Sequence, residues 1–404
     1  MKRSLLWWSA VLAAGLLSAM TFPGQTAGLS VFTDPLIAEL DIDRTAISLS
    51  YLVGTLIGAS AQPLVGRALD RWDARAVIMC IGAGFALILF LISFVTETLG
   101  LTVGFIGVRM AGQGALSLAA TTAVARAVTE RRGLALGISA AIGSAGISLA
   151  PIVLERLISA VGVHAAWRWE ALAVLLLVLP AAMLVKSAHR REAPGTVPVA
   201  ATGWTRAQAR RTGMFWVICA ATSSTSMLST ALVFHQIAVL GDQGLSPLEA
   251  AANFLPQTVT ALLSTLLVGA LIDRTNPRIW LVASMAFLAA SMLFIPLAAP
   301  GVMAILYGLL LGCAQGSQRG MEAASMVRYF GVLHIGSIRG LSVSLSLAAS
   351  AFGPYALAFG AELAGGFVLP IMVLSVIPLA VLVAGLLVKD PRDPEDAPKA
   401  RAGA

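Results

Sequence analysis

Long apolar segments alternate with short polar stretches along the whole chain. Each apolar segment holds about 20 residues, enough for an α-helix to cross the roughly 30 Å hydrocarbon core of a bilayer. The pattern predicts twelve membrane-spanning helices, at about residues 5–29, 45–65, 77–95, 99–125, 134–158, from 167 onward, 214–240, 248–272, 279–297, 301–327, 337–359 and 367–388.

The first apolar segment follows Met1-Lys2-Arg3 and in this respect resembles a signal peptide. It continues well beyond the roughly 7 to 15 apolar residues of a secretory signal, so we expect a retained helix. Pro23-Gly24 predicts a kink in this helix, and Gln25 beside it either faces a cavity or caps the break. The charged stretch from Asp34 to Arg44 predicts the first outside loop, with Asp43 capping the next helix.

A charged ten-residue stretch occurs twice, half a chain length apart. Gly66–Arg75 and Gly269–Arg278 both contain a glycine, an Asp-Arg pair four residues later and a closing arginine. A repeat of this size indicates that one helical unit is used twice. The sequence therefore predicts an all-α membrane protein of two pseudo-symmetric six-helix bundles. The predicted units are residues 1–187, a linker at 188–211, residues 212–389 and a disordered tail at 390–404.

Composition excludes a soluble globule, because 58% of the residues are hydrophobic and only 12% are charged, against about 25% in soluble domains. The three cysteines, Cys80, Cys219 and Cys313, each lie within an apolar segment, which indicates neither a metal nor redox chemistry. The net charge of +7 is scattered between segments, so no nucleic-acid partner is expected.

The basic residues predict the orientation in the membrane. Of the 27 Lys and Arg residues, Arg44, Arg156 and Arg168 lie on one side, Arg109 and Arg319 lie within apolar segments, and the rest lie on the other side. The positive-inside rule then places both termini and both repeated stretches in the cytoplasm, and we expect an inner-membrane location.

The doubled Gly-x-x-x-Asp-Arg-x-x-x-Arg stretch in two six-helix halves resembles the major facilitator superfamily. A second match, Arg109–Gly114 together with Tyr329-Phe330-Gly331, Gly336 and Gly340, resembles the bacterial branch related to monocarboxylate and oxalate/formate transporters. The resemblance implies two halves that rock about a site near the middle of the membrane, and a small organic anion as substrate. The chain departs from this branch at Thr265, where the monocarboxylate carriers have an arginine, and in segment 337–359, which lacks the lysine of the oxalate carriers.

The repeat predicts a set of conformational gating residues. Arg126 and Arg328 occupy matching places in the two halves, so we expect Asp70 to pair with Arg126 and Asp273 with Arg328. These pairs would latch the outward-open state, or merely fix the topology. The candidate gating residues are Gly66, Asp70, Arg71, Arg75, Arg126, Gly269, Asp273, Arg274, Arg278 and Arg328.

One arginine is predicted near the middle of the membrane, and a second one lies within an apolar segment of the other half. Arg109 lies about 15 Å into its helix at 1.5 Å per residue, and an intramembrane charge requires a cavity or a partner. It either holds an anion or serves as a structural arginine. Arg319 and Glu322 lie three residues apart on one helix, so they are expected to pair. Substrate competing for Arg319 would release Glu322 to take a proton; the alternative is a salt bridge without a transport role.

Further polar side chains are candidates for the site. His235 either senses outside pH or is a hydrogen-bonded core histidine. Side chains expected to bind substrate, besides Arg109 and Arg319, are Gln25, Tyr51, Gln113, Asn253 and Gln257; those expected to couple protons are Glu322 and His235.

The resemblance and these residues together predict a secondary active transporter working by alternating access, which couples protons to a small organic anion such as a monocarboxylate. Efflux of amphipathic drugs by proton antiport is the alternative, and a non-transporting sensor on the same fold is a further one. An enzyme is not expected, because the chain has no Gly-x-x-x-x-Gly-Lys loop for ATP and no catalytic constellation. The predicted partners are a small molecule, the lipid bilayer and protons, with no cofactor and a monomeric state.

Overall fold

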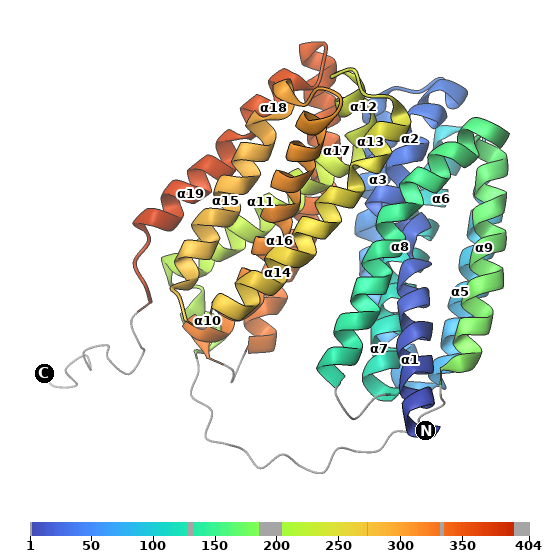
Figure 1. Ribbon diagram of the computed structural model, residues 1–404, viewed down its shortest axis with the longest axis horizontal. Coiled ribbons are helices and arrows are strands. Elements are labelled where there is room, and N and C mark those ends of the chain that lie inside the picture. Colours follow the sequence, from blue (N-terminus) through green and yellow to red (C-terminus); the bar gives the residue numbers. More distant parts are fainter. Residues whose placement is uncertain (1, 128–131, 186–203, 273, 332–334, 392–404) are drawn as a thin grey trace, which may run out of the picture.

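The computed structural model describes residues 2–127, 132–185, 204–272, 274–331 and 335–391. The elements of these ranges are helices, arranged in two bundles side by side (Figure 1). The first bundle contains α1 (Lys2–Ala19), η1 (Phe22–Gly24), α2 (Thr26–Leu40), α3 (Arg44–Ser60), α4 (Gln62–Arg71), α5 (Ala74–Ile92), α6 (Thr98–Val108), η2 (Arg109–Leu116), α7 (Ser117–Ala127), α8 (Arg132–Val161) and α9 (Val163–Leu184).

Of the predicted linker, residues 188–203 lie outside the described ranges, and the described remainder contains the short helix α10 (Arg206–Ala209). The second bundle then contains α11 (Gly213–Phe234), α12 (Gln236–Gly241), α13 (Pro247–Ala252), α14 (Phe254–Leu271), α15 (Pro277–Leu293), η3 (Ile295–Leu297), α16 (Val302–Phe330), α17 (Ile335–Ala364), α18 (Val368–Leu374) and α19 (Val376–Leu387). Of the predicted tail, residues 392–404 also lie outside the described ranges.

Length and composition allow nine helical stretches among the described residues to cross a membrane. The three other segments of the twelve-helix pattern are α1 with α2, the shorter apolar α15, and α16, which carries Arg319 and Glu322. Large apolar side chains such as Leu99, Leu266 and Leu363 are exposed on the surface, where a bilayer would cover them. The all-α membrane fold expected from the sequence is confirmed.

The first helix breaks where proline and glycine predict it. Pro23 and Gly24 lie in the 3₁₀ turn η1 between α1 and α2. The predicted outside loop from Asp34 to Arg44 was too long: α2 continues to Leu40 and includes Asp34 and Glu39, so that only residues 41–43 connect it to α3. Asp43 caps α3 as expected, with its carboxylate accepting a hydrogen bond from the Ala46 amide at 2.6 Å.

The break in the first helix packs directly on the π-helix η2. A side chain at Gly24 would meet the Val108 carbonyl oxygen at 2.5 Å, and one at Gly112 would meet the Gly24 Cα at 2.8 Å. Only glycine permits this approach of two backbones. A π-helix shifts the register of the residues it contains, and here its first residue, Arg109, comes within reach of the broken turn.

The two ends of the molecule differ in charge and in contact between the bundles. We call the end at which α1 begins and α10 lies the basic end; it carries Arg71, Arg75, Arg206, Arg278 and Arg328. In Figure 1 the ribbons of the two bundles diverge toward this end and converge at the opposite end, near α2, α12, α13 and α17.

Side-chain contacts join the bundles at the opposite end. The Thr45 amide donates to the Glu362 carboxylate at 3.0 Å, and the Arg44 guanidinium lies 5.5 Å from the Phe367 ring centre. Tyr51 of α3 and Phe234 of α11 pack with ring centres 4.5 Å apart. Nearer the middle, the hydroxyls of Ser148 and Thr258 are hydrogen-bonded. This end is therefore closed by contacts between the two bundles.

Candidate functional site

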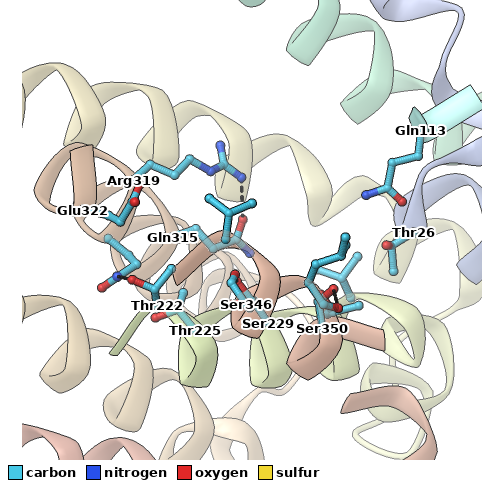
Figure 2. A pocket seen from close by; sticks show the side chains of 16 residues that line it. Thr26, Gln113, Thr222, Thr225, Ser229, Gln315, Arg319, Glu322, Ser346 and Ser350 are labelled. Carbon is cyan, nitrogen blue, oxygen red and sulfur yellow. Dashed lines mark hydrogen bonds between the residues drawn. The ribbon is translucent and has the colours of Figure 1, made fainter. Parts of the chain in front are cut away.

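A cavity of about 500 Å³ lies between the bundles, with most of its wall on α11, α16 and α17 (Figure 2). Two smaller cavities, of about 340 and 240 Å³, share lining residues with it. The main cavity is lined chiefly by hydroxyl and amide side chains: Thr26, Gln113, Thr222, Thr225, Ser226, Ser229, Thr230, Gln315, Gln318, Ser346 and Ser350. Its apolar lining residues are Val233, Val343 and Leu347, and its charged ones are Arg319 and Glu322.

Arg319 supplies the cavity with an unneutralised positive charge. Its guanidinium makes one long hydrogen bond, 3.4 Å from Nη2 to Oε1 of Gln315, four residues earlier on α16. Within the described part of the chain no carboxylate lies within ion-pair distance of it. The same side chain also lines the 240 Å³ cavity. An anion entering either space would meet a cation whose planar donors are almost all available.

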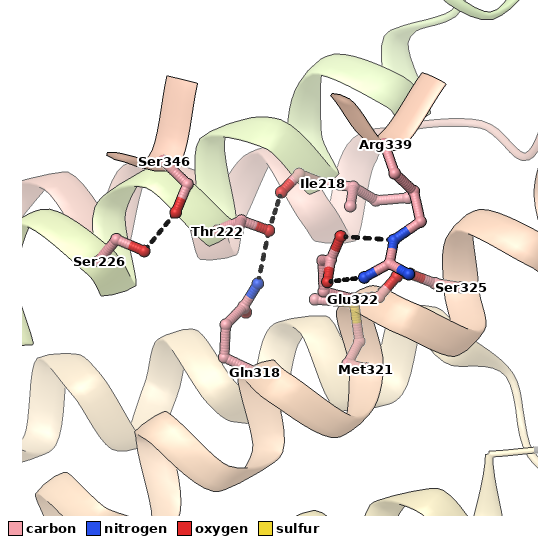
Figure 3. Close-up of polar contacts among 9 residues, drawn as sticks. All are labelled: Ile218, Thr222, Ser226, Gln318, Met321, Glu322, Ser325, Arg339 and Ser346. Carbon is pink, nitrogen blue, oxygen red and sulfur yellow. Dashed lines mark hydrogen bonds and ion pairs between the residues drawn. The ribbon is translucent and has the colours of Figure 1, made fainter. Parts of the chain in front are cut away.

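Glu322 pairs with a different arginine from the one we predicted. Nε and Nη2 of Arg339, on α17, lie 3.3 and 3.1 Å from the two carboxylate oxygens of Glu322 (Figure 3). The predicted Arg319–Glu322 pair is wrong, although the two residues share a helix face. A guanidinium from the facing helix presents two parallel donors to the carboxylate, and this two-point geometry is stronger than a single contact.

Sequence reasoning missed Arg339, which it counted among the basic residues of a cytoplasmic turn. The residue is the fifth of α17, which begins at Ile335, two residues before the predicted segment 337–359. The available signal was an arginine within an apolar helix whose partner had to come from the facing helix.

Hydrogen bonds fix the polar wall between α11, α15 and α16. Nε2 of Gln318 donates to the Thr222 hydroxyl at 2.8 Å (Figure 3), and the Ser284 hydroxyl donates to Oε1 of Gln318 at 3.0 Å. On the other side, the hydroxyls of Ser226 and Ser346 join α11 to α17. These bonds hold the cavity wall in place without using a charged group.

The guanidinium of Arg109 makes its contacts within the first bundle. Nε donates to the Thr55 hydroxyl and Nη1 to the Gly24 carbonyl, both at 3.0 Å. The guanidinium carbon lies 4.6 Å from the ring centre of Tyr51, whose hydroxyl is 2.7 Å from that of Thr26. Arg109 is 4% exposed and lines the 340 Å³ cavity. Of its two expected roles, these contacts favour the structural one.

Three other predicted binding residues lie near the cavities. Gln113 lines the main and the 340 Å³ cavities, and its Oε1 has no hydrogen-bond partner among the described residues. Gln25 lines the 240 Å³ cavity and also donates to the Thr21 hydroxyl at 3.0 Å, so it both faces a cavity and bonds its own kink. Gln257 lines the same cavity and donates to Oε1 of Gln236 at 2.7 Å.

Three further predicted residues lie outside these cavity walls. Asn253 is buried and donates to the Ala304 carbonyl at 2.6 Å. Tyr51 is fully buried between Arg109 and Phe234. His235 is 1% exposed at the closed end, where Nε2 lies 3.0 Å from the Pro354 carbonyl oxygen and 3.4 Å from the Ser48 hydroxyl.

The predicted gating residues lie at the basic end, and the structure describes only part of them. The side chains of Asp70 and Arg126, and all of Asp273, lie outside the described residues. Arg328 donates through Nη1 to the carbonyls of Ile272 and Thr275, at 2.9 and 2.5 Å.

The remaining gating candidates contact backbone, a neighbouring loop or solvent. Arg75 donates to the Val185 carbonyl at 3.2 Å, and Arg278 pairs with Asp390 at 2.9 Å. Arg71 and Arg274 are exposed. Gly66 and Gly269 have open space where a side chain would be.

Comparison with known proteins identifies the family. Residues 11–354 match the family model described as the Major Facilitator Superfamily. Over 231 residues the chain is 22% identical to the oxalate:formate antiporter of Oxalobacter formigenes, a match that spans 57% of this chain and 54% of the antiporter. The match thus spans about half the length of that relative.

Solved transporter structures share the fold. A bacterial homologue of the human lysosomal transporter Spinster, in an inward-facing and unoccupied conformation, superposes with a TM-score of 0.76 at 15% identity over 96% of this chain and 99% of its own. The nucleoside transporter NupG gives 0.77 at 14% identity, over 93% and 99%. The family match over most of the chain, together with the two-bundle fold, makes this protein a member of the Major Facilitator Superfamily.

Proposed function

We propose that this transporter carries a small organic anion together with a proton, by alternating access. The proposal rests on Arg319. This cation lies in the wall of the central cavity, and no carboxylate of the described chain is within ion-pair distance of it. A carboxylate substrate would supply the missing negative charge in a two-point contact. The similarity to an oxalate:formate antiporter supports an anionic substrate.

Glu322 is the proposed proton carrier. While its carboxylate is ionised, it neutralises Arg339 in the bidentate pair. Protonation of Glu322 would remove this partner and leave two positive charges, Arg319 and Arg339, beside the cavity. The freed positive charge would raise the affinity of the site for an anion, and a bound anion would in turn raise the affinity of Glu322 for a proton. One proton and one monoanion would cross together without net charge.

Alternating access fits the distribution of contacts between the bundles. We propose that both termini are cytoplasmic, that the membrane is the inner membrane, and that the cavity opens at the basic end in this conformation. The contacts at Thr45, Ser48 and Tyr51 close the opposite end. The Spinster homologue that shares the fold is itself inward-facing. Transport would require these contacts to break while the basic end closes.

We also propose that the repeated motif holds the outward-open state closed at the basic end. In that state Asp70 would pair with Arg126, and Asp273 with Arg328. Spin labels on α4 and α14 would measure the opening of the basic end. Asp70→Asn is expected to shift the distances toward the inward-open arrangement, and an unchanged distance distribution would contradict the latch.

The cavity lining argues against the two alternatives. A site for amphipathic cations needs aromatic and acidic side chains. Among the described residues that line the main cavity none is aromatic, and the one carboxylate, Glu322, is paired. A sensor needs no cavity with an unneutralised cation. We therefore retain the transporter of an organic anion.

A liposome assay tests the proposal. The purified protein would be reconstituted into liposomes loaded with a pH-sensitive dye, and an inward gradient of D-gluconate, lactate or oxalate would then be imposed. We expect at least one anion to acidify the lumen through the wild-type protein, above protein-free liposomes, and Arg319→Gln to abolish this effect. Equal acidification by wild type and Arg319→Gln would contradict the proposed site, and none with any anion would contradict the proposed transport.

A further inference from the structure

The hydroxyl groups of the main cavity include two contrasting sets. Thr222, Ser226 and Ser350 have partners: Thr222 donates to the Ile218 carbonyl at 2.9 Å, Ser226 bonds Ser346, and Ser350 donates to the Leu347 carbonyl at 2.9 Å. The bonds of Thr222 and Ser350 to the preceding turn are the ordinary state of Ser and Thr in apolar helices, and Ser226 is bonded across to another helix. These three need no ligand.

Thr225 and Ser229 belong to the second set. They line the same cavity, are only 6% and 7% exposed, and their hydroxyl oxygens have no hydrogen-bond partner in the described part of the chain. They are four residues apart on α11, which places them on one face and about 6 Å apart along the helix axis. Figure 2 shows both on the cavity side of α11, below Arg319.

A third unpartnered atom lies across the cavity, on the other bundle. Oε1 of Gln113 is buried, lines the main cavity and accepts no hydrogen bond from the described residues. In Figure 2 its side chain comes from the first bundle and faces the residues of the second. A ligand between the bundles would therefore meet unused polar groups on both sides.

The three unpartnered polar atoms indicate which chemical groups a ligand of this cavity would need. Leaving a buried donor or acceptor without a partner is costly, so such atoms in a folded protein call for an explanation. The Gln113 oxygen needs a hydrogen-bond donor, which an unsubstituted carboxylate lacks. An ammonium group would donate, but the lining carboxylate, Glu322, is already paired with Arg339. Hydroxyl groups both donate and accept, and they carry no charge.

We propose that the substrate is a carboxylate with several hydroxyl groups along its chain, that is, an acyclic sugar acid. This inference rests on the proposed function, because the carboxylate is assigned to Arg319. The hydroxyls of the ligand bond Thr225 and Ser229 on one side and Gln113 on the other. A volume of about 500 Å³ lies within the usual range for small-molecule sites and accommodates such a chain.

Three probes separate the carboxylate from the hydroxyls. D-Gluconate, with its epimers, carries both; hexanoate has the carboxylate on an unsubstituted chain of the same length; sorbitol has the hydroxyls without the carboxylate. Titration calorimetry on the purified full-length protein measures each Kd. We expect gluconate or an epimer to bind at least about 100-fold more tightly than hexanoate, since a site built for hydroxyls rejects the analogue that lacks them. Sorbitol is expected to bind at least as weakly as hexanoate.

Single substitutions locate the contacts. Ser229→Ala and Thr225→Val are each expected to raise the Kd for the sugar acid about tenfold, the usual effect of one lost hydrogen bond with its partner left unpaired, and to leave the Kd for hexanoate unchanged. Ser344→Ala is the matched control, because that hydroxyl is bonded to the Gly340 carbonyl of its own helix at 2.8 Å and lies outside the cavity lining.

The outcomes distinguish this inference from the function on which it rests. Hexanoate binding as tightly as the sugar acids, with both lost in Arg319→Gln, would overturn the inference and keep the anion site. Sorbitol binding as tightly as gluconate would overturn the inference and the role of Arg319 together. Binding of none of the probes, or sugar-acid binding unaffected by Ser229→Ala and Thr225→Val, would also overturn the inference.

Discussion

Arg109 in the first bundle and Arg319 in the second each lie within an apolar segment, and their surroundings differ. Arg109 is 4% exposed and makes two 3.0 Å hydrogen bonds and a ring contact within its own bundle. Arg319 is exposed to the cavity and makes one 3.4 Å hydrogen bond to a neighbour on its own helix. Each carries a charge whose transfer into hydrocarbon without a partner or a cavity would be energetically costly.

The difference shows that depth in the membrane does not identify a binding residue. A buried cation whose donors are satisfied by carbonyls and hydroxyls stabilises the bundle that satisfies it. A cation that faces a cavity with its donors unused is available for a ligand. The same contrast separates Glu322, which is paired with Arg339, from Arg319, which lies three residues earlier on α16 and is unpaired among the described residues.

Removing Arg109 should have the largest effect, and it should act on stability. Arg109→Met loses two hydrogen bonds and a cation–π contact, at about 1 kcal/mol each, so we expect the free energy of unfolding to fall by about 3 kcal/mol. Thermal or denaturant unfolding in detergent measures the change. Arg319→Met is the control, with an expected change below about 0.5 kcal/mol. Equal losses of stability in the two variants would contradict the structural role of Arg109 and the binding role of Arg319.

Removing Arg319 should act on binding. Arg319→Gln is expected to weaken carboxylate binding at least about 30-fold, or about 2 kcal/mol, because a charged hydrogen-bond donor is lost. Arg319→Lys keeps the charge without the planar fork and should retain part of the affinity. Titration calorimetry with D-gluconate, hexanoate and oxalate provides the measurement. An unchanged Kd in Arg319→Gln would assign the anion to another residue.

Glu322 should set the pH dependence of anion binding. The neutral form of Glu322 would no longer hold Arg339 as an ion pair, so loss of this negative charge should raise anion affinity. Glu322→Gln mimics the protonated state, so its affinity should be raised about fivefold at neutral pH and should no longer vary with pH. Glu155→Gln, at the opposite end and outside the cavities, is the control. A pH dependence that persists in Glu322→Gln would remove this residue from the coupling.

Substitution of the motif glycines should have only a small effect on stability. Gly66 and Gly269 lie in helices with open space around them, so Gly66→Ala and Gly269→Ala should change the free energy of unfolding by no more than about 1 kcal/mol, toward greater stability. Gly316→Ala is the contrasting variant, because the added carbon would lie 2.2 Å from the Ala261 carbonyl oxygen. If Gly66 and Gly269 act in gating, their alanine variants should transport more slowly than the wild type while keeping their stability.

Local signals in the sequence predicted much of the fold. Apolar segment length, the helix break at Pro23-Gly24 and the Asp43 cap depend on residues close in sequence, and the structure confirms them. The first outside loop was predicted too long, because charged residues at the end of a membrane helix look the same in the sequence as a loop. Asp34 and Glu39 continue α2 and pair instead with Arg44 and His164, each at 2.6 Å.

The site was harder to predict, because its contacts join distant segments. Spacing alone placed Arg319 and Glu322 on one face, but it contained no information on Arg339, which reaches Glu322 from α17. The unpartnered hydroxyls of Thr225 and Ser229 are likewise invisible in the sequence, where they look the same as the bonded Thr222 and Ser226. Satisfaction of a polar group depends on the packed neighbours and can be read only from the fold.

The roles of the two arginines are compared most directly by titrating the wild type, Arg319→Gln and Arg109→Lys with the same carboxylates and recording their unfolding curves. We expect Arg319→Gln to remain folded and to lose anion binding, whereas Arg109→Lys should be destabilised and, where folded, should still bind. Anion binding that survives in Arg319→Gln and disappears in folded Arg109→Lys would contradict this expectation and move the substrate to the first bundle.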